Sequence, residues 1–418
     1  MAEQWIIDLT KQLDHPPSTD NELWTKSIYR VPKILTDVNR QAYEPRLASF
    51  GPYHHGRRHL RPMEHHKHRA LIQFLRRIGK ASKSPNDVLV AMKQVESSLR
   101  FAYDSLQTEV DKDEFLKLMI TDGCFALEFM LSMMKRFATE EQSEYDSNDP
   151  VFGENGNKYV VPNLKRDMLL LENQLPLLAL STLADIQGSG MGDVNSLIKL
   201  FYDICWTSPL QRSFHILEMY RKSMTSSGGY LQSNEETVQS ATELVDAGVS
   251  ICRSDTRSFR DISFAGGKLS VPPLQMDDTT KSILLNLMAF ECLHPARRNE
   301  VTAYASFMNG LIRTTDDVAL LRKEEIITGL VGCDSNIVSM FSRITMDSTR
   351  VVYIDVIQID VIGKMADYCK KNMHKWRASF VHSYLKNPWV FISLISGVIL
   401  LSLTIVQTVY TELSYYKS

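Results

Sequence analysis

The chain has 418 residues, of which 44% are hydrophobic and 23% are charged, a composition typical of a globular protein with a substantial core. Its formal net charge of -2 at pH 7 argues against a protein that binds nucleic acid through general charge. The 6 cysteines are scattered and form no Cys-x-x-Cys pair, so the sequence predicts neither a disulfide framework nor a zinc module.

Helical periodicity dominates the N-terminal half. Apolar residues recur at helical spacing over 60–78, with arginines on the opposite side, and predict an amphipathic helix. Residues 115–134 predict a second, buried helix. Residues 164–183 are apolar on most sides, which is typical of a helix in the middle of a bundle, and Pro176 predicts a kink or a break within them.

Strand-like alternation is scarce. The best example is 258–271, where two short apolar runs flank Gly266 and Gly267 and predict a small β-hairpin. The fold class is therefore mainly α: a helical globular body with a small β-hairpin excursion and one C-terminal transmembrane helix.

Composition also suggests how the chain is divided. An acidic loop occupies 139–157, and a polar, turn-rich segment separates two parts of the body. The predicted divisions are an N-terminal helical part (1–222), a flexible loop (223–236), a C-terminal part with a stem helix at 351–368 (237–386), a transmembrane helix (387–410) and a short tail (411–418). A strand is the alternative for 351–368, because β-branched residues are frequent there.

The C-terminal segment from Trp389 to Tyr410 carries no charge. As a helix rising about 1.5 Å per residue it would be about 33 Å long, enough to cross a hydrocarbon core of about 30 Å. Trp389 and Tyr410 are typical of the two membrane interfaces. Ser393 and Gly397 form a small-xxx-small pair, which would allow two copies to pack as a homo-oligomer.

The charges that flank this segment predict its orientation. Asp367 alone opposes the basic residues before it, whereas Glu412 and Lys417 cancel after it, so the positive-inside rule places the body in the cytosol. The N-terminus lacks the basic and apolar regions of a signal peptide. We therefore predict a single-pass, tail-anchored protein, at the plasma membrane. The basic residues are Lys364, Lys370, Lys371, Lys375, Arg377 and Lys386.

Histidines and basic residues are concentrated over 54–83. The histidines suggest a metal site or a proton sensor, but His-Glu-x-x-His is absent and arginines intervene between His55 and His59, so we predict no metal. The basic side chains suggest contact with an anionic surface through Arg57, Arg58 and Arg61. A solvated helix face that pairs with the acidic loop is the alternative.

No known catalytic motif is present. The glycine-rich run at 188–192 has Asp193 where a dinucleotide fingerprint requires its third glycine, and neither a nucleophile elbow nor a kinase signature occurs. We therefore expect no enzymatic activity, no catalytic residue and no cofactor. The alternative is an enzyme with an unfamiliar site around Tyr53, His54 and His55, where nearby arginines would bind a phosphorylated substrate.

Several blocks along almost the whole chain resemble one plant family, the domain of unknown function 247 family. The blocks include the run from Tyr53 to Gly56 and the tail around Gln407. The signature residues that carry the resemblance are Tyr29, Val31, Pro32, Tyr43, Pro45, Gly51, Pro52, Tyr53, His54, Gly56, Asp122, Gly123, Phe125, Glu172, Asn173, Gln174 and Pro176.

The resemblance implies a plant, membrane-associated, helical protein without known catalytic activity. Some grass members are linked to self-incompatibility as candidate pollen-side determinants, which implies recognition of, or signalling to, an unidentified protein partner. The signature residues also have architectural interpretations: prolines fix the chain direction, glycines permit tight turns, and tyrosine and histidine side chains satisfy buried backbone groups. We expect most of them to be architectural.

Overall fold

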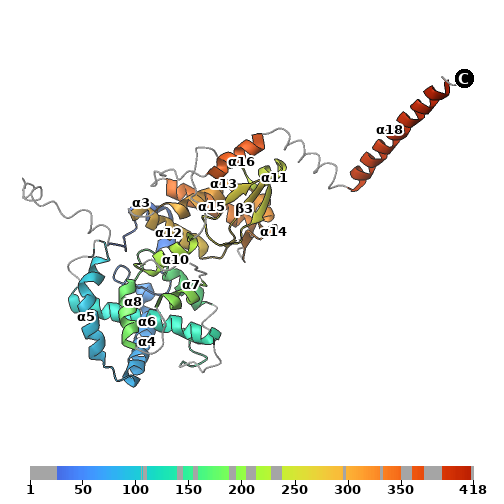
Figure 1. The fold of residues 1–418 in the computed structure, drawn as a ribbon. Helices are drawn as coiled ribbons and strands as arrows, with labels where there is room; N and C mark the ends of the chain where they lie inside the picture. The colour runs from blue at the N-terminus through green and yellow to red at the C-terminus, as the bar shows by residue number, and fades with distance from the viewer. Residues whose placement is uncertain are drawn as a thin grey trace, which may run out of the picture.

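A computed structural model describes most of the chain, and the helical class predicted from the sequence is confirmed (Figure 1). The predicted loop at 223–236 lies largely outside the described residues, so the division of the body stays a prediction. The described residues are 26–104, 106, 111–138, 145–153, 159–187, 194–203, 213–226, 238–294, 298–329, 333–349, 360–370 and 388–415.

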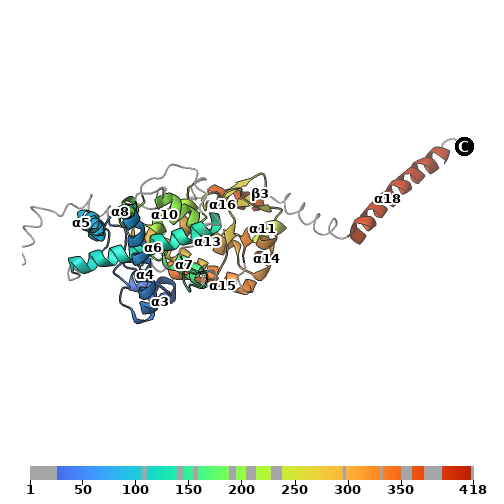
Figure 2. The ribbon, with the colours of Figure 1, turned by 90° about the horizontal axis from the view of Figure 1, so that it is seen from below.

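Several N-terminal helices pack around the long helix α6 (Lys112–Ala138). Helix α4 packs on α6 and crosses it in both views (Figures 1 and 2), and α5, α8 and α9 also contact α6. The other elements of this part are α3 (Lys33–Tyr43), the 3-10 helix η1 (Arg58–Leu60), α4 (Arg61–Lys80), α5 (Pro85–Phe101), α7 (Val160–Asp167), α8 (Leu177–Gln187), α9 (Val194–Phe201) and α10 (Ile216–Met224).

Local sequence explains where these helices begin and what they bury. Helix α4 has a proline in its first turn, where no backbone donor is needed, and buries the predicted stripe that includes Phe74 and Ile78. Helix α5 begins with a capping box: the Ser84 hydroxyl accepts from the Asp87 amide, and the Asp87 carboxylate accepts from the Ser84 amide at 2.7 Å.

The helix expected over 164–183 is instead two helices. Helix α7 ends at Asp167 and α8 begins at Leu177, so the break is much wider than a proline kink. The reason lies in side chains that replace helical hydrogen bonds: the Gln174 amide donates to the carbonyls of Met168 (2.7 Å) and Leu170 (2.8 Å).

A small sheet contains the predicted hairpin. Strands β2 (Ser263–Ala265) and β3 (Lys268–Val271) are antiparallel, and the glycines between them have φ of 59° and 84°, as a two-residue type I′ turn requires. The sequence interpretation missed β1 (Ser250–Arg253), which pairs with β3 in parallel. A second sheet pairs β4 (Leu274–Gln275) with β5 (Ile327–Thr328), also in parallel.

The C-terminal helices contact these sheets and one another, and several of the contacts join helices that are not consecutive in the chain. Helix α13 packs on α12 and α15, and α14 packs on α11 and α15. The predicted stem helix is described only from residue 360, where α16 packs on β2. The bounds are α11 (Ala241–Asp246), α12 (Thr280–Leu293), α13 (Glu300–Leu311), α14 (Thr315–Lys323), α15 (Asp334–Thr349) and α16 (Asp360–Lys370).

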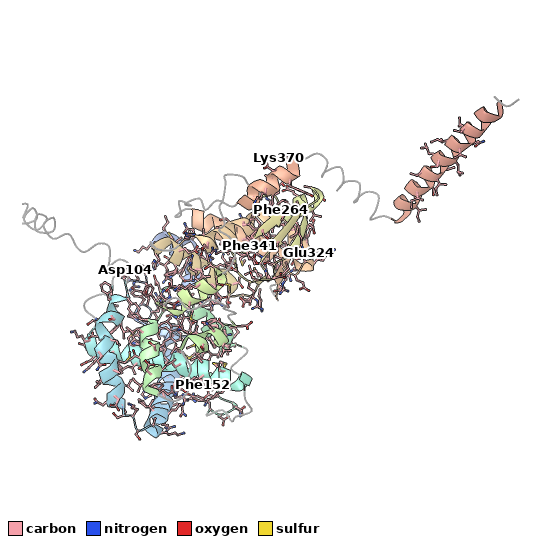
Figure 3. The ribbon with its side chains drawn as sticks, viewed as in Figure 1. Asp104, Phe152, Phe264, Glu324, Phe341 and Lys370 are labelled. Carbon is pink, nitrogen blue, oxygen red and sulfur yellow. The ribbon has the colours of Figure 1, made fainter. Side chains whose placement is uncertain are left out.

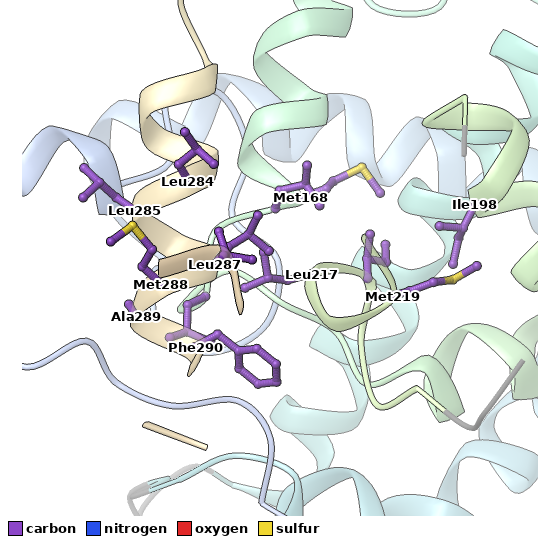
Figure 4. Packing of buried hydrophobic residues seen from close by; sticks show 14 of the residues in the cluster. Met168, Ile198, Leu217, Met219, Leu284, Leu285, Leu287, Met288, Ala289 and Phe290 are labelled. Carbon is purple, nitrogen blue, oxygen red and sulfur yellow. The ribbon is translucent and has the colours of Figure 1, made fainter. Parts of the chain in front are cut away.

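One cluster of buried apolar side chains joins the two parts of the body, and it includes residues from Ile28 to Cys369. Figure 3 shows side chains filling the space between helices in both parts of the body. Helix α10 contacts α12, and Figure 4 shows Leu217 of α10 beside Leu287 of α12. The helices around α6 and those around α13 therefore share a continuous core.

The C-terminal segment is helical, as α18 (Pro388–Tyr415), and its large apolar side chains from Ile392 to Val409 have exposed fractions between 43% and 66%. Among the helices that the structure describes, none is found to combine the length and apolar character needed to cross a bilayer. The transmembrane part of the predicted fold class therefore stays a prediction.

Hydrogen bonds to Asp317 connect α14 to α11. Its carboxylate accepts from the Thr242 amide (2.8 Å) and hydroxyl (2.7 Å) in α11, and from the Thr314 amide (2.8 Å) at the start of its own helix. Burial alone would raise the pKa of Asp317, but these bonds lower it from 3.8 to about 2. The bonds therefore favour the folded state wherever Asp317 would ionise in the unfolded chain.

Replacement of Asp317 by Asn should destabilise the protein at neutral pH. It should also make the free energy of unfolding less dependent on pH in acid. The depressed pKa gives about 2 kcal/mol of stability, fully present above pH 3.8 and lost as the pH falls through about 2. Urea unfolding at pH 7 and near pH 3 should show a smaller loss at the lower pH. Asp316→Asn, at an exposed neighbour, is the control, and an equal effect of both variants would contradict the assignment.

Candidate functional site

The signature residues meet in one buried polar network. The chain between α3 and η1, residues 44–57, lies against α4, α6 and the connection from α7 to α8, and hydrogen bonds from all three hold it there. Because these contacts join residues up to 123 positions apart, the network fixes the tertiary fold as well as the local chain path.

Asp167 and Arg166 anchor the start of this segment. The Asp167 carboxylate accepts from the backbone amides of Arg46 (3.0 Å), Leu47 (2.7 Å) and Ala48 (3.1 Å). Arg166 pairs with it at 2.9 Å and donates to the Gln41 and Glu44 carbonyls at 2.6 and 3.0 Å. Burial raises the pKa of Asp167, and the amide bonds and Arg166 oppose that effect. Both side chains are fully buried, so their role is to hold backbone.

Asn173 and Gln174 complete the anchoring. The Asn173 side chain accepts from the Phe50 amide (2.7 Å) and donates to the carbonyls of Ala48 (3.0 Å) and Asp167 (2.9 Å). Gln174 uses its amide nitrogen within the α7–α8 connection and accepts from the Leu217 amide of α10 at 3.1 Å. These amides are therefore engaged on both their donor and acceptor sides.

Lys67 lies at the centre of the network. Its ammonium group is 2.8 Å from the Asp122 carboxylate, 2.7 Å from that of Glu64 and 2.7 Å from the Ser49 carbonyl, and the other Asp122 oxygen accepts from the Gly51 amide at 2.9 Å. Burial alone would lower the pKa of Lys67, but the two carboxylates raise it. Burial raises the pKa of Asp122, and Lys67 and the Gly51 amide oppose that effect. Lys67 is therefore held as a buried cation by its carboxylate partners, and it does not belong to the basic surface that its sequence neighbours suggest.

His54 is enclosed beside Glu172. Its side chain is 1% exposed, with Nε2 at 3.4 Å from the Glu172 carboxylate, and neither ring nitrogen has a hydrogen-bond partner within the described chain. Burial, followed by the charges of Arg57 and Arg30, lowers the pKa of His54 to about 3. His54 is therefore neutral at physiological pH and unsuited to the proton-sensor role suggested by the histidine cluster.

Tyr53 is also directed inward. Its hydroxyl contacts the backbone carbonyls of Asp104 and Ile28, and the Arg30 guanidinium lies 4.1 Å from the centre of its ring. Burial raises the pKa of Tyr53. A substrate would have to open this packing to reach Tyr53 or His54, so the arrangement disfavours the enzyme hypothesis without testing it.

The remaining signature residues are packing or turn positions. Phe125 stacks on Phe50 with ring centroids 5.9 Å apart, and the Val31 amide donates to Glu172 at 2.7 Å. Three more of these residues make hydrogen bonds or backbone pairs: the Tyr29 hydroxyl donates to the Lys26 carbonyl, the Pro45 carbonyl contacts His59, and Pro176 forms a β-bridge with His215. Pro32 precedes α3, Tyr43 is buried at the end of α3, and Pro52 is partly buried. Gly56 has a positive φ, and Gly123 packs against Leu183.

The predicted anionic-surface residues fall into two kinds. The Arg57 side chain pairs with Glu44 at 2.6 Å, whereas Arg58 and Arg61 are exposed. No group of three or more histidine, cysteine or acidic side chains within the described segments is arranged to hold a metal ion.

Residues that sequence reasoning did not single out as site residues are central to this network. Lys67, Arg166 and Asp167 are charged and fully buried. Their presence in the blocks that resemble the plant family was the available signal, since nothing in their local periodicity marks a buried charge.

Comparison with known proteins agrees with the whole-chain resemblance. A family described as plant protein of unknown function matches residues 28–403. The UPF0481 protein At3g47200 of Arabidopsis thaliana is 28% identical over 93% of this chain and 86% of its own length. A putative UPF0481 protein from the same plant, At3g02645, is 21% identical over 97% of this chain and 94% of its own. No solved structure matches.

Alanine at Gly51 should destabilise the fold far more than alanine at Gly56. Both glycines have positive φ, 74° and 79°, but an added Cβ at Gly51 would lie 2.8 Å from the Gln174 carbonyl oxygen, whereas at Gly56 it would meet nothing within 4 Å. We expect a loss of about 1 kcal/mol for Gly56→Ala from backbone strain alone, and about 2 kcal/mol more for Gly51→Ala. Urea unfolding measures both, and equal losses would contradict the close approach.

Removal of the buried Lys67 ammonium group should destabilise the fold, and simultaneous removal of the Asp122 carboxylate should restore part of the lost stability. Lys67→Met leaves Asp122 buried and unpaired, for which we expect about 3–5 kcal/mol of destabilisation. The double variant Lys67→Met/Asp122→Leu should be more stable than the single one. Glu64→Gln, at the partly exposed partner, should cost much less. Additive effects in this double-mutant cycle would show that the pair is not coupled.

Proposed function

Because this chain belongs to the domain of unknown function 247 family of plant proteins, we propose that it is a non-enzymatic recognition or signalling protein whose C-terminal helix attaches it to a membrane. Its helical body would bind an unidentified protein partner, and self-incompatibility recognition, suggested by the resemblance to grass members, would be one form of this role.

The inward orientation of the signature residues carries the non-enzymatic part of the proposal. Asp167 and Asn173 bind backbone groups, Lys67 is paired, and His54 is buried and neutral. Side chains that could perform acid–base chemistry are thus occupied in holding the fold. A rigid body held in this way leaves the exposed surface to make specific contacts.

The attachment to a membrane is supported by the C-terminal sequence. Residues 389–410 are uncharged, and the large apolar side chains that the structure describes between Ile392 and Val409 are exposed, an arrangement that a lipid environment would cover. Because no spanning helix is found among the described residues, the support for an anchor is the sequence. The basic flank before it favours a cytosolic body and a single pass.

The same helix supports a proposal of self-association. Ser393 and Gly397 lie on one face of α18, and a Cβ at Gly397 would meet nothing within 4 Å among the described residues, so this position is open for a second helix. Chemical crosslinking in native membranes should give a dimer, and monomer alone would count against this proposal.

Protease protection on sealed membrane vesicles tests the anchor and its orientation. We expect a tag at the N-terminus to be digested from the cytosolic side, a tag at the C-terminus to be protected, and the protein to resist carbonate extraction. Leu401→Arg places a charge near the middle of the segment, which costs about 2.5–3.5 kcal/mol on insertion, and should lower the membrane fraction. Protection of the N-terminal tag would show the opposite orientation. Complete extraction of the protein by carbonate would show that the C-terminal helix is not a membrane anchor.

A further inference from the structure

The exposed face of α4 carries a row of basic side chains that the buried network does not use. The members of this basic stripe share one side of the helix or the turn that leads into it, and all are exposed. They are Arg58, Arg61, His65, His68, Arg76 and Lys80. Along the helix from Arg61 to Lys80 the stripe is about 29 Å long at about 1.5 Å per residue.

The other lysine and arginine side chains of α4 are paired with carboxylates. Lys67 binds Asp122 at 2.8 Å, Arg69 binds Asp149, and Arg77 binds Glu128 through two bonds of 2.5 and 2.8 Å. By contrast, no ion pair to a stripe residue is present among the residues that the structure describes. The helix therefore separates two sets of cations, and the outer set is available to an external partner.

The pairing of Arg69 with Asp149 also bears on the acidic loop predicted at 139–157. It places Asp149, in the described part of that loop (145–153), beside α4, where it pairs with a residue outside the stripe. Helix α4 packs on α6, which it crosses in Figures 1 and 2, and the stripe residues are exposed, so the packed side of α4 and its exposed side are distinct.

The stripe has the shape and chemistry of a surface for a flat anionic partner. Its charges follow one rigid helix, and Ile72, which is 39% exposed, lies among them. A row of cations with an apolar side chain suits lipid headgroups, where each basic side chain near the surface contributes about a fivefold gain in partitioning.

We propose that the basic stripe of α4 binds anionic lipid headgroups of the membrane to which the C-terminal helix attaches the protein. This inference rests on the proposed function, because attachment by the tail raises the local concentration of lipid at the stripe and makes a modest intrinsic affinity sufficient. The stripe would hold the body against the bilayer and so determine which surfaces face a protein partner.

The test uses the full chain, labelled with a fluorophore at its N-terminus, in vesicles that contain an acceptor-labelled lipid. One set of vesicles is neutral phosphatidylcholine, and the other contains roughly 30% phosphatidylserine to supply the negative surface potential. We expect higher energy transfer in the anionic vesicles and loss of this difference at high salt.

A four-residue variant of the stripe and a matched control make the test specific. Arg58, Arg61, Arg76 and Lys80 all changed to Gln should remove the lipid-dependent difference, whereas Lys93, Lys117, Lys268 and Lys323 all changed to Gln, which removes the same charge from other exposed positions, should retain most of it. Circular dichroism checks that both variants are folded.

Failure of the inference and failure of the anchor give different results. If the tail does not insert, the wild-type protein should still float with anionic vesicles and not with neutral ones, and the stripe variant should float with neither. Equal energy transfer in both vesicles, or equal loss in both variants, would overturn the proposal. Binding of the stripe to polyglutamate without any response to lipid charge would assign it to an acidic protein instead.

Discussion

The fold depends on buried carboxylates that bind the backbone of residues 44–57. Asp167 and Asp122 accept from backbone amides on either side of Phe50, and each is balanced by one buried cation, Arg166 or Lys67. A buried charge is tolerated only when it is paired and hydrogen-bonded. The segment therefore has one position in which all of these groups are satisfied, and α4, α6 and α7 must be packed together for that position to exist.

This constraint changes how the signature residues are interpreted. A run such as Tyr53 to Gly56, with charged and aromatic neighbours, has the composition of a catalytic site. In the folded chain Tyr53 contacts backbone carbonyls and His54 is enclosed and neutral. A motif can thus be long and specific because it specifies a fold, and its polar side chains are then poor indicators of chemistry.

Helix α4 illustrates the division between architecture and surface. Its inner side supplies Lys67 to the network, while its outer side carries Arg76 and Lys80 into solvent. Helical geometry separates these residues although they are close in sequence. Function in this protein is therefore more readily sought on exposed faces and in the tail than in the signature itself.

The sequence by itself determined the features that depend on local periodicity and composition. The amphipathic helix α4, the buried helix α6 and the turn at Gly266 and Gly267 follow from residue spacing and from backbone preferences. The uncharged run after Trp389 is likewise evident without a structure, as is the resemblance that identified the family.

Only the tertiary structure decided which charges are buried and which helices are interrupted. Asp167 binds Ala48, and β1 joins β3 in parallel, through contacts between distant parts of the chain that no local pattern records. The same holds for Gln174, whose side chain replaces backbone bonds and separates α7 from α8. Burial selects partners by three-dimensional proximity, so these outcomes depend on the packed chain as a whole.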